Sequence, residues 1–114
     1  MNWTLPLINL YAGNNTIEVE LIGLKDASDN SYINDATVTA TIHEEDGTTE
    51  VTGETWPISL AYVTASNGDY RGVVSADSNI VARTKYQITI SATDADGNKG
   101  EWINFAIASR RMLT

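Results

Sequence analysis

A two-residue alternation of apolar and polar side chains recurs in four separate stretches of this sequence. Isoleucine, valine, leucine, alanine and tyrosine recur at every second position, with threonine, serine or glutamate between most of them, in 17–21, 37–43, 58–62 and 86–93. Successive side chains of an extended chain point to opposite faces, so this spacing is typical of strands with one buried face. No stretch sustains the i, i+3, i+4 apolar spacing of a helix. The sequence therefore predicts an all-β protein.

Turn-forming dipeptides separate these stretches. Asp46-Gly47, Asn67-Gly68 and Asp96-Gly97 supply the positive backbone φ values that tight hairpins require. Regular turns between short strands favour an immunoglobulin-like β-sandwich of about seven to eight antiparallel strands. The expected strands cover 5–11, 16–24, 35–45, 56–64, 68–75, 84–94 and 99–108, with a further short piece at 48–52.

Tyr86 opens the sixth expected strand directly after an irregular stretch. This is the place of a tyrosine corner, in which the hydroxyl bonds to the backbone a few residues upstream. Ile88, two positions later, then takes the inward position that a disulfide-forming cysteine occupies in antibody domains. The chain has no cysteine, so its core must hold without disulfides.

The length and the net charge of the chain argue against several classes of function. The chain has 114 residues, enough for one domain. Seven Lys and Arg against fifteen Asp and Glu give a net charge of −8, which disfavours nucleic acid and anionic membranes as partners. We find no cationic, apolar secretory signal and no apolar run near the roughly 18 residues of a membrane helix. A protein made in the cytoplasm, without a membrane partner, is the expectation.

The two ends differ from residues 13–109, which carry the predicted sandwich. Residues 1–12 form an apolar arm in which Pro6 restricts the chain to a sheet edge or a bulge. The arm either packs as an edge strand on its own domain or contacts a neighbouring subunit. Residues 110–114 form a basic tail, either a frayed end or an attachment to an acidic face. The contact residues expected at the ends are Trp3, Leu5, Leu7, Ile8, Leu10, Tyr11, Arg110 and Arg111.

The residues offer no catalytic constellation. His43 is the only histidine and is expected to lie exposed on a threonine-lined face. A nucleophilic serine or threonine needs a positioned base, and His43 is the only ordinary candidate. Several carboxylates gather around one hairpin, where we expect them to be solvated: Glu44, Glu45, Asp46, Glu50 and Glu54. We expect no enzymatic activity and no cofactor.

The segment 94–98 resembles the start of a calcium loop, because Asp94, Asp96 and Asn98 alternate as such ligands do. The sixth position is Lys99 where that loop needs glycine, and the twelfth is Phe105 where it needs glutamate. A hairpin turn is therefore the favoured interpretation. A weak calcium site in the loops, using Asp26 and Asp29, is the alternative.

Aromatic side chains are the remaining candidates for binding. The strand 99–108 is expected to turn Ile103, Phe105 and Ile107 toward the core. Trp102 then lies on the outer face, and Trp56 is likewise out of phase with its apolar neighbours. Exposed aromatics anchor protein interfaces or stack on sugar rings, unless loops cover them. We favour an interface at Trp56 and Trp102, with a sugar platform at Trp56, Trp102 or Tyr70 as the alternative.

Two motifs resemble a known group of proteins. Gly53-Glu54-Thr55-Trp56-Pro57 and Gly68-Asp69-Tyr70-Arg71-Gly72 are similar to the G-x-x-W-P and G-x-Y-x-G motifs of small immunoglobulin-like proteins encoded among the structural genes of tailed bacteriophages. Those proteins also have a later strand that opens with tyrosine, here Tyr86, and a short apolar lead-in with a glycine turn, here 11–15.

The resemblance implies a virion structural protein, located in the phage particle as a head decoration, minor head or neck component. Its partners would be capsid or other virion proteins and copies of itself in a homo-oligomer. Two alternatives stay open. One is a carbohydrate-binding module for a host-surface glycan, and the other is an immunoglobulin-like repeat excised from a bacterial adhesin.

Overall fold

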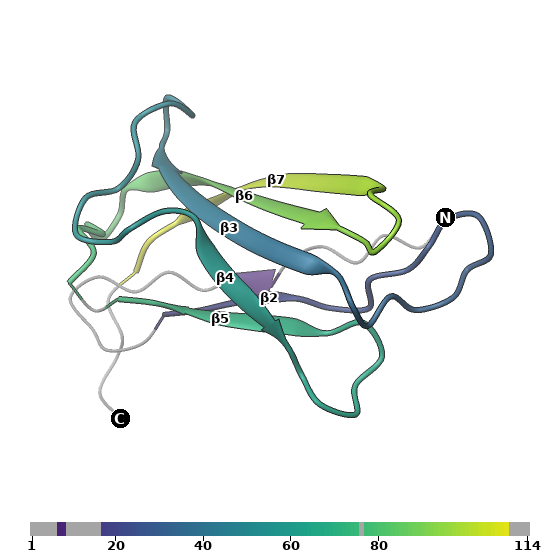
Figure 1. Ribbon diagram of the computed structural model, residues 1–114. Helices are drawn as coiled ribbons and strands as arrows, with labels where there is room; N and C mark the ends of the chain where they lie inside the picture. The colour runs from purple at the N-terminus through teal and green to yellow at the C-terminus, as the bar shows by residue number, and fades with distance from the viewer. Residues whose placement is uncertain (1–6, 9–16, 76, 110–114) are drawn as a thin grey trace.

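The structure, a computed structural model, describes residues 7–8, 17–75 and 77–109. This part of the chain is all-β and contains no helix, and hence none that could span a membrane. Six strands of five to nine residues, together with a two-residue strand β1, form one antiparallel sheet (Figure 1). Each strand lies within a stretch predicted from the sequence. The strands are β1 (Leu7–Ile8), β2 (Ile17–Leu21), β3 (Thr37–Glu44), β4 (Ile58–Tyr62), β5 (Tyr70–Val74), β6 (Lys85–Thr93) and β7 (Lys99–Ile107).

The sheet is curled, with the strand order β1-β2-β5-β4-β3-β6-β7. Strand β4 makes the turn between its two halves, because it pairs with β3 through Val38 and Leu60 and with β5 through Ala61 and Arg71. As a result β2 and β5 lie opposite β3, β6 and β7 (Figure 1). The short piece expected at 48–52 is no strand, and only an isolated bridge joins Glu50 to His43.

The space between the two halves holds one apolar core. In β3 and β6 every second residue is buried, as the alternation predicts. Burying these side chains is the main favourable contribution to folding, at about 25 cal/mol per Å² of apolar surface. The largest of the fully buried side chains are Tyr70, Leu21, Ile42, Ile88, Ile90, Val19, Val38 and Val74.

Two buried tyrosines tie loops to the sheet. The Tyr86 hydroxyl accepts a hydrogen bond from the Val81 backbone N–H at 2.7 Å, five residues upstream, which confirms the predicted corner contact. The Tyr70 hydroxyl donates to the Ile33 carbonyl at 2.8 Å and accepts from the Ala36 N–H at 3.1 Å. Because Tyr70 is only 1% exposed, the interpretation of its ring as a sugar platform was wrong.

The predicted orientation of β7 was also wrong. Ile103, Phe105 and Ile107 are 57%, 48% and 66% exposed, whereas Trp102 is partly buried against the core. The register explains the difference, because Trp102 lies directly opposite the buried Ile90 of β6. Residues directly opposite in an antiparallel pair point to the same face of the sheet, so Trp102 has to point inward.

Candidate functional site

Two surfaces of the described residues have side chains suited to binding. The first is a hollow beside Trp102, which we call the Trp102 hollow. The second is the exposed row of Ile103, Phe105 and Ile107 on the outer face of β7, which we call the β7 stripe.

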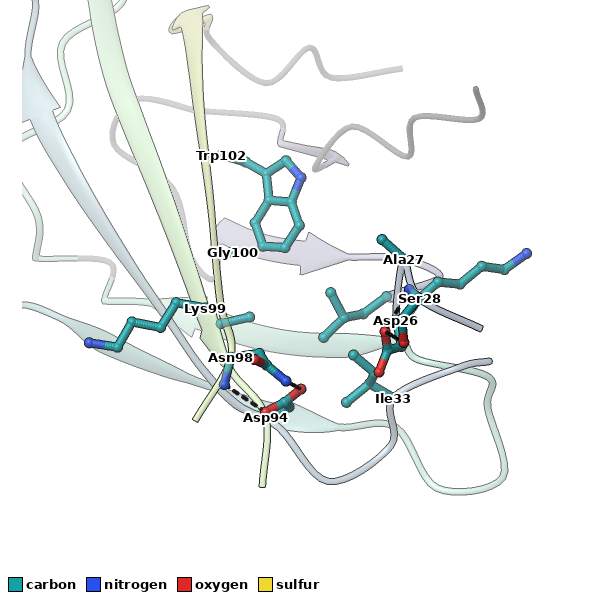
Figure 2. A pocket seen from close by; sticks show the side chains of 12 residues that line it. Asp26, Ala27, Ser28, Ile33, Asp94, Asn98, Lys99, Gly100 and Trp102 are labelled. Carbon is teal, nitrogen blue, oxygen red and sulfur yellow. Dashed lines mark hydrogen bonds between the residues drawn. The ribbon is translucent and has the colours of Figure 1, made fainter. Parts of the chain in front are cut away.

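The Trp102 hollow opens at one end of the curled sheet and has a volume of about 410 Å³. The loop after β2 forms one side, and the β6–β7 turn with the first residues of β7 forms the other (Figure 2). Its volume lies within the range of about 300–1,000 Å³ that is usual for small-molecule sites. The lining residues are Leu24, Lys25, Asp26, Ala27, Ser28, Ile33, Ala92, Asp94, Asn98, Lys99, Gly100 and Trp102.

Small residues keep the hollow open beneath the indole ring. Ala92 of β6 lies directly opposite Gly100 of β7, so no bulky side chain fills this part of the strand pair. A Cβ on Gly100 would lie 2.9 Å from Cη2 of Trp102. The absence of a side chain at Gly100 is thus what allows the ring to lie against the strand.

Two carboxylates face the hollow from opposite sides (Figure 2). Oδ1 of Asp26 accepts hydrogen bonds from the backbone N–H and the hydroxyl of Ser28, at 2.8 and 2.7 Å. Oδ1 of Asp94 accepts from the N–H groups of Asp96 and Asn98, and its Oδ2 accepts from Asn98 Nδ2 at 3.0 Å. The side-chain hydrogen bond from Asn98 is the main cause that lowers the pKa of Asp94. Asp94 is therefore ionised at neutral pH.

The segment 94–98 is the hairpin turn that the sequence favoured over a calcium loop. Its Asp94 carboxylate is occupied by donors from the turn itself, and Gly97 takes a φ of +86°. The two other proposed ligands are directed to their own loop, Asp26 to Ser28 and Asp29 to Ser31. Among the described residues, no group of three or more His, Asp or Glu side chains is placed to hold a metal ion.

The two lysines of the lining are directed elsewhere. Lys25 Nζ lies 4.7 Å from the centroid of the Tyr32 ring, in a cation–π contact. The side chain of Lys99 points away from the hollow (Figure 2). The polar groups that the hollow presents are therefore mainly hydrogen-bond acceptors, while its formal charge of two Lys and two Asp sums to zero.

The β7 stripe lies at the end of the sheet order formed by the described strands. Its three apolar side chains occupy alternate positions of one strand, and Lys85 Nζ lies 4.7 Å from the centroid of the Phe105 ring. The neighbouring positions on β6 and β3 are polar: Phe105 lies opposite Gln87, which lies opposite His43. The stripe is thus an apolar row on an otherwise polar face.

His43 was predicted to be exposed, but it is partly buried, and its Nδ1 is buried without a hydrogen-bond partner among the described residues. The chain turns back along β3 here, since Val51 N–H donates to the Ile42 carbonyl and an isolated bridge joins Glu50 to His43.

The acidic hairpin behaves largely as predicted. Glu44, Glu45, Asp46 and Glu50 are exposed, as expected for solvated carboxylates. Glu54 is the exception, because it is partly buried and its Oε2 accepts the Ser75 N–H at 2.7 Å.

The structure describes three of the other predicted contact residues, Leu7, Ile8 and Trp56. Trp56 is partly buried and donates its Nε1–H to the Val51 carbonyl at 2.7 Å, so its own domain covers much of the ring. Leu7 and Ile8 form β1 and pair with β2 of the same chain, as the edge-strand interpretation of the arm has it. The others lie outside the described residues: Trp3, Leu5, Leu10, Tyr11, Arg110 and Arg111.

Comparison with protein-family models, with curated proteins and with solved structures found no match to this chain.

Proposed function

We propose that this protein is a non-enzymatic structural component of a bacteriophage particle, located in the virion, that binds capsid or other virion proteins through the β7 stripe. The observation that carries the proposal is the exposure of Ile103, Phe105 and Ile107, between 48% and 66%, on one strand at the end of the sheet. Grouped large apolar side chains on a protein surface mark interaction sites.

The proposed fold behind this role is an immunoglobulin-like sandwich. The curled sheet places β2 and β5 opposite β3, β6 and β7 around one core, and the Tyr86 hydroxyl makes the corner contact to Val81. Both features are typical of that architecture. The motif residues Trp56 and Tyr70 serve this fold rather than a partner, since both pack into the domain.

The chemistry of the β7 stripe suits a protein partner. Aromatic and aliphatic anchors surrounded by charged residues are the usual composition of an interface core and its rim. Lys85, Lys99 and Glu101 provide that rim on β6 and β7. Since each stripe side chain is about half exposed, covering it contributes roughly half of the about 1.5–3 kcal/mol of full burial.

The test uses particles purified from the phage that encodes the chain. We expect mass spectrometry to detect the protein in particles that sediment as a single band. A triple variant, Ile103→Thr, Phe105→Thr and Ile107→Thr, keeps β-branched or strand-compatible residues but removes the apolar surface. We expect its incorporation to fall at least tenfold.

Val73→Thr is the matched control, because Val73 is 51% exposed on β5 in the other half of the sheet. It should be incorporated like the wild type. Absence of the protein from the particles, or full incorporation of the folded triple variant, would contradict the proposal.

A further inference from the structure

The Trp102 hollow is held open by the fold itself. The loop that forms one side is fixed by backbone hydrogen bonds from Leu24 N–H to the Gly68 carbonyl at 2.9 Å and from Ile33 N–H to the Leu24 carbonyl at 2.9 Å. On the other side, Gly100 leaves the indole ring seated against β7. A ligand would find the site largely formed, so little binding free energy is lost in ordering it.

Two side-chain oxygens that line the hollow are free to accept hydrogen bonds. Both hydrogen bonds that the described residues donate to Asp26 end on Oδ1, which leaves Oδ2 for a ligand. Asn98 uses its Nδ2 on Asp94 and its backbone carbonyl accepts the Asp94 N–H, which leaves the side-chain Oδ1 of Asn98. Such a set requires a ligand with several donors, and hydroxyl groups are donors of this kind.

The remaining walls determine the rest of the ligand. Trp102 offers an aromatic surface, and Leu24 and Ile33 add apolar area. The ammonium groups of Lys25 and Lys99 are directed away from the hollow, so the charges that it presents are the carboxylates of Asp26 and Asp94, which disfavour an anionic ligand. A neutral ring with hydroxyls at its edge and C–H groups on its face matches all three properties.

From this geometry we propose that the Trp102 hollow binds a sugar ring, with the ring face against Trp102 and a hydroxyl donated to Asp26 Oδ2. The site is separate from the β7 stripe, because Trp102 and the stripe residues point to opposite faces of β7. This proposed sugar binding does not depend on the proposed role in a phage particle. For a ligand as small as one sugar, we expect dissociation constants in the millimolar range.

The test titrates the ¹⁵N-labelled full chain with methyl glycosides of glucose, galactose, mannose and N-acetylglucosamine. We expect at least one glycoside to shift the Trp102 indole N–H and the backbone amides of Ser28 and Asn98 saturably. The indole N–H of Trp56, which donates to Val51, should not respond.

The loop supplies a matched pair of variants. Asp26 and Asp29 each accept the N–H and the hydroxyl of the serine two residues later, but only Asp26 lines the hollow. Asparagine keeps the turn at either position, because its amide oxygen still accepts these bonds. Asp26→Asn should weaken sugar binding about tenfold, since a charge-assisted bond is lost, and Asp29→Asn should leave it unchanged.

Trp102→Ala should abolish the shifts. If that variant does not fold, the comparison of Asp26→Asn with Asp29→Asn still tests the sugar site. Absence of saturable shifts with every glycoside, or equal weakening by Asp26→Asn and Asp29→Asn, would overturn the proposal. Shifts at these same groups with Ca²⁺ or tetramethylammonium, but with no sugar, would assign the hollow to a cation and overturn it as well.

Discussion

A single buried hydroxyl group, that of Tyr70, fixes a loop to the sheet by hydrogen bonds. The Tyr70 hydroxyl lies between the carbonyl of Ile33 and the N–H of Ala36, both in the connection from β2 to β3. Its ring meets Tyr62 edge-on at 5.7 Å, so packing and hydrogen bonding act on the same residue. The tyrosine of the G-x-Y-x-G motif therefore connects β5 to a segment more than thirty residues away.

Removing that hydroxyl tests this role. Tyr70→Phe keeps the ring but leaves one carbonyl and one N–H without their partner, which should lower the free energy of unfolding by about 1–3 kcal/mol. Urea denaturation followed by circular dichroism measures the change. Tyr32→Phe, at a residue that is 45% exposed, should change stability little, and an equal loss in both variants would contradict the assignment.

At the level of whole strands, the sequence predicts where each element lies better than which way it faces. The alternation in β3 and β6 has one apolar parity, so both position and orientation could be predicted. In β7 both parities carry apolar residues: Trp102 and Ala106 on one, and Ile103, Phe105 and Ile107 on the other. Because the pattern of this strand is apolar on both faces, it does not fix the orientation, and the pairing of Trp102 with the buried Ile90 of β6 decides it. The Trp102 hollow could not be predicted from the sequence either, because the residues that line it come from the loop after β2, from the β6–β7 turn and from the adjoining strands, which are far apart in sequence.

The hairpin after β3 gives a pH-dependent prediction. Asp46 accepts the hydroxyl and N–H of Thr49 and the N–H of Thr48, and these bonds lower its pKa from 3.8 to about 2. A lowered folded pKa means that ionised Asp46 stabilises the native state above about pH 4 and that this is lost as the pH falls toward 2.

Thermal unfolding of the wild type and of Asp46→Asn between about pH 5 and pH 2 measures this contribution. The difference in melting temperature should shrink as the pH falls through this range. Glu45→Gln, an exposed neighbour in the hairpin, controls for the loss of one negative charge. A difference that stays constant with pH would show that the carboxylate does not stabilise the hairpin.

Over the whole molecule, both halves of the sheet share one core, so they should unfold together. Ile88 of β6 and Val19 of β2 belong to the same buried cluster. Ile88→Ala should lower the free energy of unfolding by about 2–5 kcal/mol through the lost contacts and the cavity. Ile103→Ala, the same change at an exposed site, should cost less than about 1 kcal/mol.

Denaturation followed by tryptophan fluorescence and by circular dichroism measures both the stability of the two variants and whether the halves of the sheet unfold together. The two signals should change in a single coincident transition in both variants. Separate transitions would mean that the halves of the sheet are independent, and a similar cost at both isoleucines would mean that β7 faces the other way.

The strand order has a consequence for the newly made chain on the ribosome. Strand β2 pairs with β5, so that Val19 meets Gly72, and β3 pairs with β6, so that Val38 meets Ala92. Until residues 70–74 have left the exit tunnel, the only partner of β2 among the described residues is the two-residue strand β1. Pairings this distant in sequence make folding slow and leave strand edges exposed meanwhile. Strand β2 is therefore synthesised before β5 but takes its native place late, after the middle of the chain has emerged.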